Sequence, residues 1–161
     1  MSEFLRKFEL IARKAFKFSQ LETRELGPVH PFDIRNIHQS LPHDVRTLFD
    51  NGHYSQATFE AFKFVDKTVQ HLSEINKSGF DLMMRAFSET SPQILLNANV
   101  SVSEKDEQQG YKFIFSGCAL GVRNPRGHEC DLKDPPELCL DHLCLASMLL
   151  RKLESAGYDI P

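Results

Sequence analysis

The fold is decided by residues 55–72, SQATFEAFKFVDKTVQHL. The apolar side chains of this stretch recur every three or four residues, which is the spacing that places them on one face of an α-helix. They are Ala57, Ala61, Phe62, Val65, Val69 and Leu72. Ser55 is a typical N-cap residue, and Ser78–Gly79 breaks the pattern. We therefore expect one long helix with a buried face, against which other helices pack.

Other segments show the same helical spacing. Short helices are expected at 41–49 and 80–87, a longer one at 104–122, and a leucine-rich last helix at 135–156. Residues 89–104 are rich in Asn and Ser and contain a proline, which predicts a loop with at most a short strand at Ile94–Leu96. The sequence thus predicts an all-α fold, a bundle of four to five helices that occupies residues 32–161.

The first 31 residues are expected to form an N-terminal helical extension. Apolar residues at helical spacing between positions 3 and 18, with lysines and arginines on the other faces, predict an amphipathic helix. Gly27–Pro28 and His30–Pro31 mark the residues after it as a connector. The helix packs through its phenylalanines, with its lysines in solvent, or it uses its basic face to contact RNA or a membrane surface; the packed helix is the preferred interpretation.

Composition bounds the class of protein. The chain has 161 residues, of which 41% are hydrophobic and 25% charged, as is typical of one folded domain. No apolar run approaches the roughly 18 residues of a membrane span, and the start lacks a secretory signal. We therefore expect a cytoplasmic protein with no membrane partner and with reduced thiols at its four cysteines. The net charge of −3 means that RNA binding requires a local basic patch.

Residues 123–128, Arg-Asn-Pro-Arg-Gly-His, concentrate reactive side chains where the apolar periodicity stops. Arginine offers a planar charged fork that fits a phosphate, and histidine exchanges protons near neutral pH. In a continuous helix, Arg123 and His128 would point about 140° apart. Pro125 and Gly127 are expected to bend the chain and to bring His128 back toward Arg123.

This segment resembles the Arg-x4–6-His signature of the HEPN superfamily (higher eukaryotes and prokaryotes nucleotide-binding). Its position after the penultimate helix of a predicted bundle makes the resemblance more specific. From about residue 40 to about residue 158, the chain is also similar to small prokaryotic and phage-associated Ymh-type proteins. The segments that carry this similarity are Phe80–Met83, Gln109–Gly110, Phe115–Gly117, Arg123–Pro125 and Leu149–Leu153.

The resemblance implies a HEPN-like bundle that forms a two-fold dimer and, in many members, cleaves RNA without a metal ion or cofactor. The motif of each protomer would then line a shared cleft. Many such proteins act in phage defence or as toxins of toxin–antitoxin pairs, so an antitoxin or a defence-system protein is an expected partner. Other members have lost catalysis and only bind nucleotides or RNA, and this alternative stays open.

Metal-independent RNA cleavage needs a base, an acid and positive charge at the phosphate. His128 is the expected base or acid, and Arg123 is the expected clamp on the phosphate oxygens. Asn124 is expected to orient His128 or to hold the 2′-hydroxyl. Arg126 is either a second phosphate contact or a solvated arginine. These four residues form the predicted catalytic and binding site.

Lys63 and Glu60 join the substrate-binding residues if the long helix borders the cleft. One histidine in each motif cannot easily be both acid and base in one step, and a two-fold dimer brings in the second copy. The face of Gly117 and Gly121 and the leucine-rich last helix are the candidate dimer contacts. Both could equally belong to the core of one protomer.

A zinc site is the competing interpretation of the nearby thiols and imidazoles. The candidate ligands are Cys118, His128, Cys130, Cys139, His142 and Cys144. No Cys-x2-Cys pair occurs among them and several lie in apolar helical patterns, so we expect no metal. In the non-catalytic alternative, an arginine of the motif pairs with an acid such as Glu129 or Asp131. His53 is a turn residue unless the fold brings it to the cleft.

Overall fold

The computed structural model describes residues 7–9, 11–12, 29–129 and 131–161. The chain divides into two compact units, Met1–His30 and Pro31–Pro161. In the first unit, residues 7–9 and 11–12 are helical, and the rest of the predicted amphipathic helix lies outside the described residues. The second unit carries the helical bundle and the candidate site.

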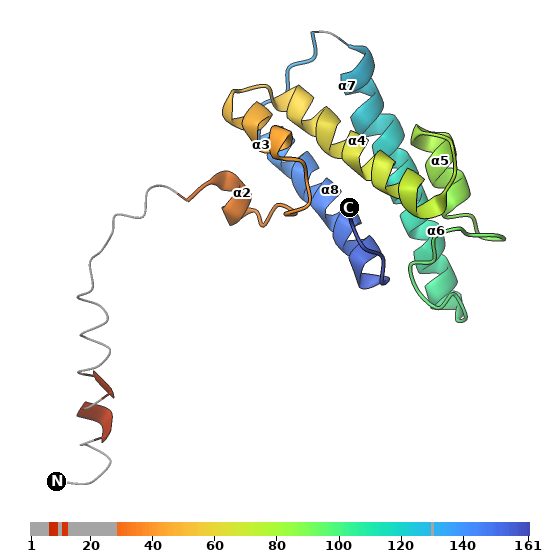
Figure 1. Cartoon of the computed structure of the whole chain (residues 1–161), viewed down its shortest axis with the longest axis horizontal. Helices are drawn as coiled ribbons and strands as arrows, with labels where there is room; N and C mark the ends of the chain where they lie inside the picture. Colours follow the sequence, from red (N-terminus) through yellow and green to blue (C-terminus); the bar gives the residue numbers. More distant parts are fainter. Residues whose placement is uncertain (1–6, 10, 13–28, 130) are drawn as a thin grey trace. The chain divides into compact units, whose positions relative to one another are not determined.

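Every regular element described in the second unit is a helix, which confirms the all-α prediction (Figure 1). In chain order these are α2 (Pro31–Ile34), α3 (His43–Asp50), α4 (Tyr54–Ser73), α5 (Gly79–Ala86), α6 (Val102–Gly117), the π-helix η1 (Cys118–Arg123), α7 (Asn124–His128) and α8 (Pro136–Ser155). None of the described helices combines the length and the apolar character that crossing a membrane requires.

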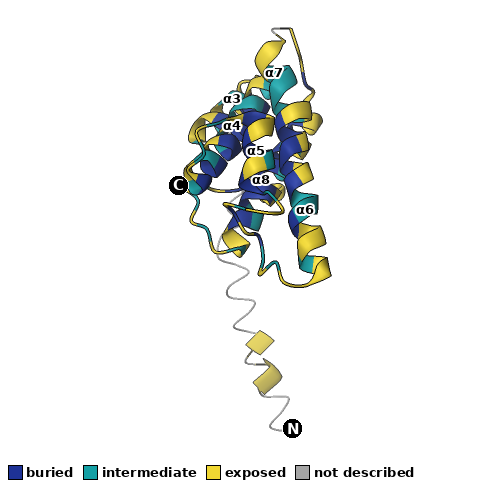
Figure 2. Cartoon of the chain, turned by 90° about the vertical axis from the view of Figure 1, so that its right-hand side faces the viewer, coloured by how far each residue is buried: buried dark blue, intermediate teal, exposed yellow. Residues whose placement is uncertain are grey.

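The long helix predicted at 55–72 is α4, and it is the centre of the bundle (Figure 1). It packs against α3, α8, α5, η1 and α7. Its predicted core residues Ala57, Ala61, Phe62, Val65 and Val69 are buried. The other large contribution to the core comes from the leucines of α8. Figure 2 shows buried segments on α4 and α8 and exposed segments toward the ends of α6 and α7.

Ser55 is not the N-cap residue that the sequence predicted. α4 begins at Tyr54, and the N-cap position is His53, whose side chain makes no capping hydrogen bond. The Ser55 hydroxyl instead donates to the carbonyl of Leu132 at 2.7 Å and accepts the backbone N–H of Asp134 at 2.8 Å. Ser55 therefore fastens the connection between α7 and α8 to the start of α4.

The predicted helix over 104–122 does not end before the Arg-His segment. α6, η1 and α7 follow one another without a break, so the bend expected at Pro125 and Gly127 is wrong. In an α-helix, a proline ring collides with the carbonyl four residues earlier. η1 widens the turn directly before Pro125, and there the N–H of Asn124 bonds the carbonyl of Ala119. The wider turn makes room for the ring, and the segment stays helical.

Candidate functional site

Arg123, the last residue of η1, turns its guanidinium toward α4. Its Cζ lies 5.4 Å from the ring centroid of Phe59, and its Nη1 donates to Oδ1 of the neighbouring Asn124 at 3.1 Å. Its Nε is buried without a hydrogen-bond partner among the described residues. One aromatic face and one amide thus hold the guanidinium, and part of its hydrogen-bonding capacity is left unused in the described structure.

Phe59 also lies beside Lys63, one turn later on α4. The Nζ of Lys63 is 5.9 Å from the ring centroid of Phe59 and donates to both carboxylate oxygens of Glu60 at 3.0 Å. Around one ring the structure therefore gathers four of the predicted site residues, Arg123, Asn124, Lys63 and Glu60. Sequence reasoning missed the ring itself, although Phe59 and Lys63 are four residues apart on a predicted helix and so share a face.

Gly127 explains how α7 comes so close to α4. A Cβ atom at this position would lie 2.8 Å from Cε2 of Phe59, which is closer than carbon atoms pack without displacement. A glycine lets α7 approach the ring without such a collision. The sequence predicted a bend at Gly127, and its observed role is this close approach between helices.

His128 ends α7 and is exposed. Because η1 and α7 are both helical, Arg123 and His128 do not converge in the way that the predicted bend required. No contact joins their side chains within the described part of the chain. Asn124 lies four residues before His128, so the two side chains share a face of α7. Asn124 thus bonds the arginine and neighbours the histidine.

Arg126 is engaged inside the protein. Its Nε and Nη2 donate to the two carboxylate oxygens of Asp134 at 2.6 and 2.8 Å, and its Nη1 donates to the carbonyl of Val122 at 2.8 Å. Only 7% of the Arg126 side chain and 4% of the Asp134 side chain are exposed. The interpretation of Arg126 as a solvated arginine is therefore wrong. Its guanidinium is bonded to Asp134 and Val122, so it is not free to make the second phosphate contact that the sequence also suggested. The acidic partner is Asp134 and not Glu129 or Asp131, which are both exposed.

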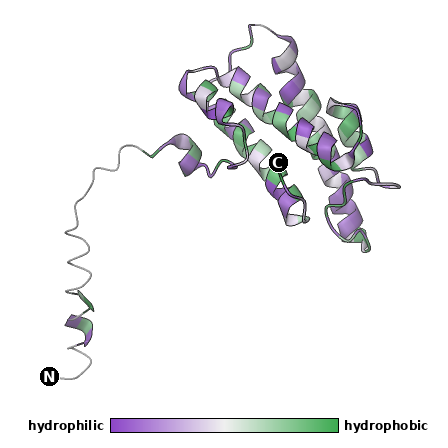
Figure 3. Cartoon of the chain, in the orientation of Figure 1, coloured by the Kyte–Doolittle hydropathy of each residue, from purple (hydrophilic) through white to green (hydrophobic). Residues whose placement is uncertain are grey.

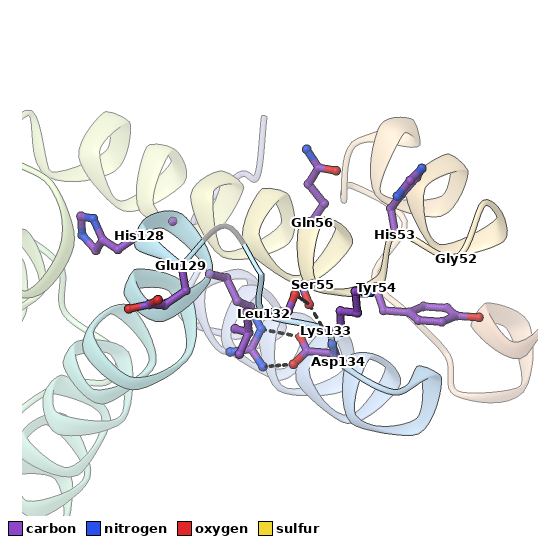
Figure 4. Close-up of a pocket in the computed structure, with 12 residues that line it drawn as sticks. Gly52, His53, Tyr54, Ser55, Gln56, His128, Glu129, Leu132, Lys133 and Asp134 are labelled. Carbon is purple, nitrogen blue, oxygen red and sulfur yellow. Dashed lines mark hydrogen bonds and ion pairs between the residues drawn. The ribbon is translucent and has the colours of Figure 1, made fainter.

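A cavity of about 600 Å³ lies between the start of α4 and the connection from α7 to α8 (Figure 4). Its polar lining includes His53, Gln56, His128, Glu129 and Lys133. The fold thus brings His53 to a cavity that His128 also lines. Figure 4 shows the two imidazoles at opposite ends of the group of lining residues, where they do not face one common point.

An apolar face of α6 and η1 points outward. A Cβ atom added at Gly117 or Gly121 would meet no described atom within 4 Å, so no neighbouring backbone explains these glycines within the described protomer. Near them in sequence, Phe113, Ile114 and Leu120 are 54%, 40% and 55% exposed. Figure 3 shows this hydrophobic part of the helix between the hydrophilic start of α6 and the hydrophilic α7. The leucines of α8, the other candidate dimer contact, lie largely in the core.

Two thiols and one imidazole near the site, those of Cys118, Cys139 and His142, are buried or partly buried and have shifted pKa values. Burial raises the pKa of Cys118 and of Cys139 to about 11, so both stay protonated near neutral pH. Burial, helped by the charge of Arg126, lowers the pKa of His142. Among the residues that the structure describes, no three His, Cys, Asp or Glu side chains are grouped to hold a metal ion. Cys130, one of the candidate zinc ligands, lies outside them.

The family model described as "Protein of unknown function (Hypoth_ymh)" matches residues 35–153. This range contains α3 to α7 and most of α8. It therefore includes every residue of the cavity and of the Phe59 cluster, by which we mean Phe59, Glu60, Lys63, Arg123 and Asn124. No curated protein and no solved structure matches the chain.

Proposed function

The chain belongs to this Hypoth_Ymh family of unknown function, and we propose that it is a metal-independent endoribonuclease of the HEPN type that acts as a homodimer in the cytoplasm. The observation that carries the proposal is the Phe59 cluster. There, Arg123 bonds Asn124 and lies beside the same ring as Lys63. His128 continues the face of α7 on which Asn124 lies.

The proposed reaction begins when the ribose 2′-hydroxyl loses its proton and its oxygen attacks the adjacent phosphorus. The bond to the 5′-oxygen then breaks, that oxygen gains a proton, and a 2′,3′-cyclic phosphate remains. His128 moves one of these protons, since an imidazole titrates near neutral pH. Arg123 donates hydrogen bonds to the non-bridging oxygens, where negative charge builds up. Asn124 orients His128 or holds the 2′-hydroxyl.

Lys63 and Glu60 form an exposed pair at the edge of this cluster, with side chains 47% and 34% exposed. Exposed ion pairs are weak, so a phosphate of the RNA chain can replace Glu60 as the partner of the Lys63 ammonium. Lys63 then supplies the additional positive charge that the buried Arg126 cannot supply. This exchange makes Lys63 a substrate contact beside Arg123.

The dimer supplies the second proton-transfer group. His53 cannot take that role at the same phosphate if it stays at the other end of the cavity from His128 (Figure 4). A two-fold interface brings identical surfaces together, and the outward face of Gly117, Gly121 and Leu120 leads directly into Arg123. The glycines allow the backbones of two copies to approach closely. Two copies of His128 would then serve one shared cleft.

The resemblance to HEPN proteins also suggests a setting. Such a nuclease acts in phage defence or as a toxin, and an antitoxin or a defence-system protein restrains it. Growth arrest on expression that His128→Ala relieves would support this part of the proposal. Equal growth of cells that express the wild type and His128→Ala at matched protein levels would contradict the toxin role.

One observation favours a second candidate function. Within a protomer Arg123 and His128 make no described contact, so a monomer would hold a phosphate at Arg123 without the acid and base together. Such a protein would be a non-catalytic module that binds RNA or nucleotides. The oligomeric state therefore separates the two functions.

The test is RNA cleavage by the full chain in the presence of EDTA. Wild type should cleave and leave a 2′,3′-cyclic phosphate, and Arg123→Ala and His128→Ala should both lose activity while they remain folded. His71→Ala, at an exposed position on the far part of α4, is the matched control and should cleave normally. Intact RNA with wild type across single-stranded, structured and transfer RNAs would contradict the nuclease.

The dimer is tested separately by light scattering. Wild type should have the mass of two chains. Leu120→Asp places a charge in the middle of the proposed apolar interface, so this variant should be a monomer and should not cleave RNA. Val100→Asp changes another exposed apolar residue, which lies outside this face, and should leave the dimer intact. A wild type that stays monomeric at all concentrations while cleaving RNA would contradict the shared cleft.

A further inference from the structure

We infer that Phe59 is a positioning residue for the proposed reaction, and that its ring holds the Arg123 guanidinium in the orientation that meets the phosphate. The side chain of Phe59 has no polar atom, so it acts through Arg123 and not on the substrate. Its role in cleavage rests on the proposed function. The ordering of the guanidinium by the ring does not depend on that function.

The position of the ring is fixed from two sides. Phe59 belongs to α4, the helix at the centre of the bundle, and the Cε2 edge of its ring packs against α7 at Gly127. A Cβ atom at Gly127 would lie 2.8 Å from Cε2, so the ring fills space that a larger residue on α7 would need. A ring held between two helices is a rigid support for a neighbouring side chain.

Arg123 depends on this ring more than Lys63 does. The Cζ of Arg123 lies 5.4 Å from the ring centroid, and its guanidinium makes one hydrogen bond, from Nη1 to Oδ1 of Asn124 at 3.1 Å. No carboxylate pairs with Arg123 in the described part of the chain. Lys63 lies over the same ring but is also held by Glu60. Loss of the ring should therefore release Arg123 and leave Lys63 in place.

In this orientation the nitrogens of Arg123 differ in what they can bind. Nε is buried and has no acceptor. Nη2 also has no hydrogen-bond partner, but it is not among the buried atoms, so it reaches the surface. Nη1 and Nη2 form one edge of the guanidinium, and two N–H groups side by side fit two oxygens of a phosphate. The ring thus supports the guanidinium with its binding edge accessible and with Nε turned inward.

A support of this kind contributes to the rate of a reaction. A free arginine side chain loses rotamer freedom when it binds the transition state, whereas a guanidinium that is already held loses less. The aromatic contact alone corresponds to about fivefold at an exposed site. Removal of the guanidinium costs about 100-fold to 1000-fold in kcat. Loss of the ring should therefore lower kcat by an intermediate factor of about tenfold.

The first test is RNA cleavage by the full chain in EDTA, measured as kcat and KM. Phe59→Leu keeps an apolar side chain without an aromatic face, and its kcat should fall about tenfold. KM should change little, because Lys63 and Glu60 stay in place. In the Arg123→Ala background, Phe59→Leu should lower kcat no further, since the ring then has nothing to position. Phe64→Leu is the matched control and should cleave normally: Phe64 is a half-buried residue of α4 with no cation over its ring in the described structure.

The second test does not need a nuclease. An aromatic face shifts the NMR resonance of a proton above it upfield, so the Nε–H signals of the arginines report the ring directly. Arg123→Lys identifies the signal of Arg123 by its disappearance. Wild type should show this signal upfield and in slow exchange with water, because Nε is buried. Phe59→Leu should move it to an ordinary position and speed its exchange, and Phe64→Leu should match wild type.

The outcomes separate this inference from the proposed function. An equal fall in kcat with and without Arg123 would mean that Phe59 contributes packing alone, and an unchanged kcat in Phe59→Leu would mean that the ring is dispensable. Either result overturns the positioning role. An ordinary, rapidly exchanging Arg123 Nε–H signal in wild type overturns the ordering of the guanidinium. If wild type cleaves no RNA but shows the expected NMR difference, the nuclease fails and the ordering of Arg123 by the ring stands.

Discussion

Arg123 and Arg126 lie three residues apart on one continuous helical segment, and they end in opposite environments. Arg126 makes three hydrogen bonds to Asp134 and Val122 and is almost fully buried with its carboxylate partner. Arg123 is only partly buried, and its described contacts are one aromatic face and one side-chain amide. The same residue type thus closes the fold at Arg126 and, one turn earlier at Arg123, has a guanidinium nitrogen with no hydrogen-bond partner among the described residues.

The difference separates the structural role of Arg126 from the functional role that we propose for Arg123. A buried arginine with a bidentate carboxylate has its geometry fixed and little left to offer a substrate. A cation held by an aromatic face keeps donors for an incoming phosphate, and an exposed contact of this kind contributes only about 0.5–1 kcal/mol. Removing the carboxylate partner of Arg126 should therefore cost mainly stability, whereas removing Arg123 should cost mainly activity.

The largest expected effect is on stability, in Asp134→Ala. This change leaves the Arg126 guanidinium buried without its partner, and such losses cost about 3–5 kcal/mol in the free energy of unfolding. Urea denaturation measures it. Asp131→Ala removes an exposed acid from the same connection and should change stability by less than about 0.5 kcal/mol. Equal, small effects of the two changes would show that the pair does not hold the connection.

The next largest effect is on activity, in Arg123→Ala. Removing a donor that stabilises transition-state charge costs about 100-fold to 1000-fold in kcat, whereas the lost aromatic contact should lower stability by no more than about 1 kcal/mol. Single-turnover cleavage and urea denaturation give the two numbers. Arg85→Ala, at an exposed position of α5, is the control for loss of a positive charge. If Arg123→Ala lost as much free energy of unfolding as Asp134→Ala, Arg123 would also have a structural role, which would contradict the difference between the two arginines.

Gly127→Ala tests the surface that supports Arg123. The new Cβ would lie 2.8 Å from Cε2 of Phe59, so the ring or α7 must move, and overpacking of this kind costs about 1–3 kcal/mol. The double change Gly127→Ala with Phe59→Leu should recover part of that loss, because the colliding ring edge is gone. Gly110→Ala is the matched control: its Cβ meets no described atom, and it should stabilise α6 by up to about 1 kcal/mol. A stabilising Gly127→Ala would contradict the close approach.

The contrast between the arginines also marks the limit of what the sequence could predict. Helical periodicity was enough for α4 and α8, because long amphipathic patterns report directly which face is buried. The motif was also enough to select Arg123, Asn124 and His128 as candidate site residues. It could not show that Arg126 pairs with Asp134 or that Phe59 packs against Gly127. These contacts depend on how α4, α7 and the connection to α8 meet in space, and local spacing carries no information about that.

The helical course through Pro125 was missed for a related reason. A proline and a glycine close together usually end a helix, and the sequence analysis weighed only that local tendency. In the structure, the π-helical turn before Pro125 packs against α4 and α5, and these contacts between helices cannot be read from local spacing. The chain stays helical through Pro125, so Asn124 and His128 share one face of α7.

The smallest expected effect is on stability and concerns His142 of α8, whose pKa is influenced by the charges of the buried pair Arg126 and Asp134. Burial lowers its pKa first, the charge of Arg126 lowers it further, and Asp134 and Asp141 act in the opposite direction. The folded pKa is therefore below the unfolded value of about 6.5. As the pH falls through that value, the unfolded chain binds the proton more readily than the folded chain. The contribution of neutral His142 to the free energy of unfolding is therefore present above about pH 6.5 and is lost below it.

Urea denaturation of wild type and His142→Gln measures this contribution. The free energy of unfolding of wild type should exceed that of His142→Gln by more at pH 7.5 than at pH 5.5, whereas His71→Gln, which changes an exposed histidine, should show no such trend. An advantage that grows toward low pH would mean that Asp134 and Asp141, rather than burial and Arg126, dominate the surroundings of His142.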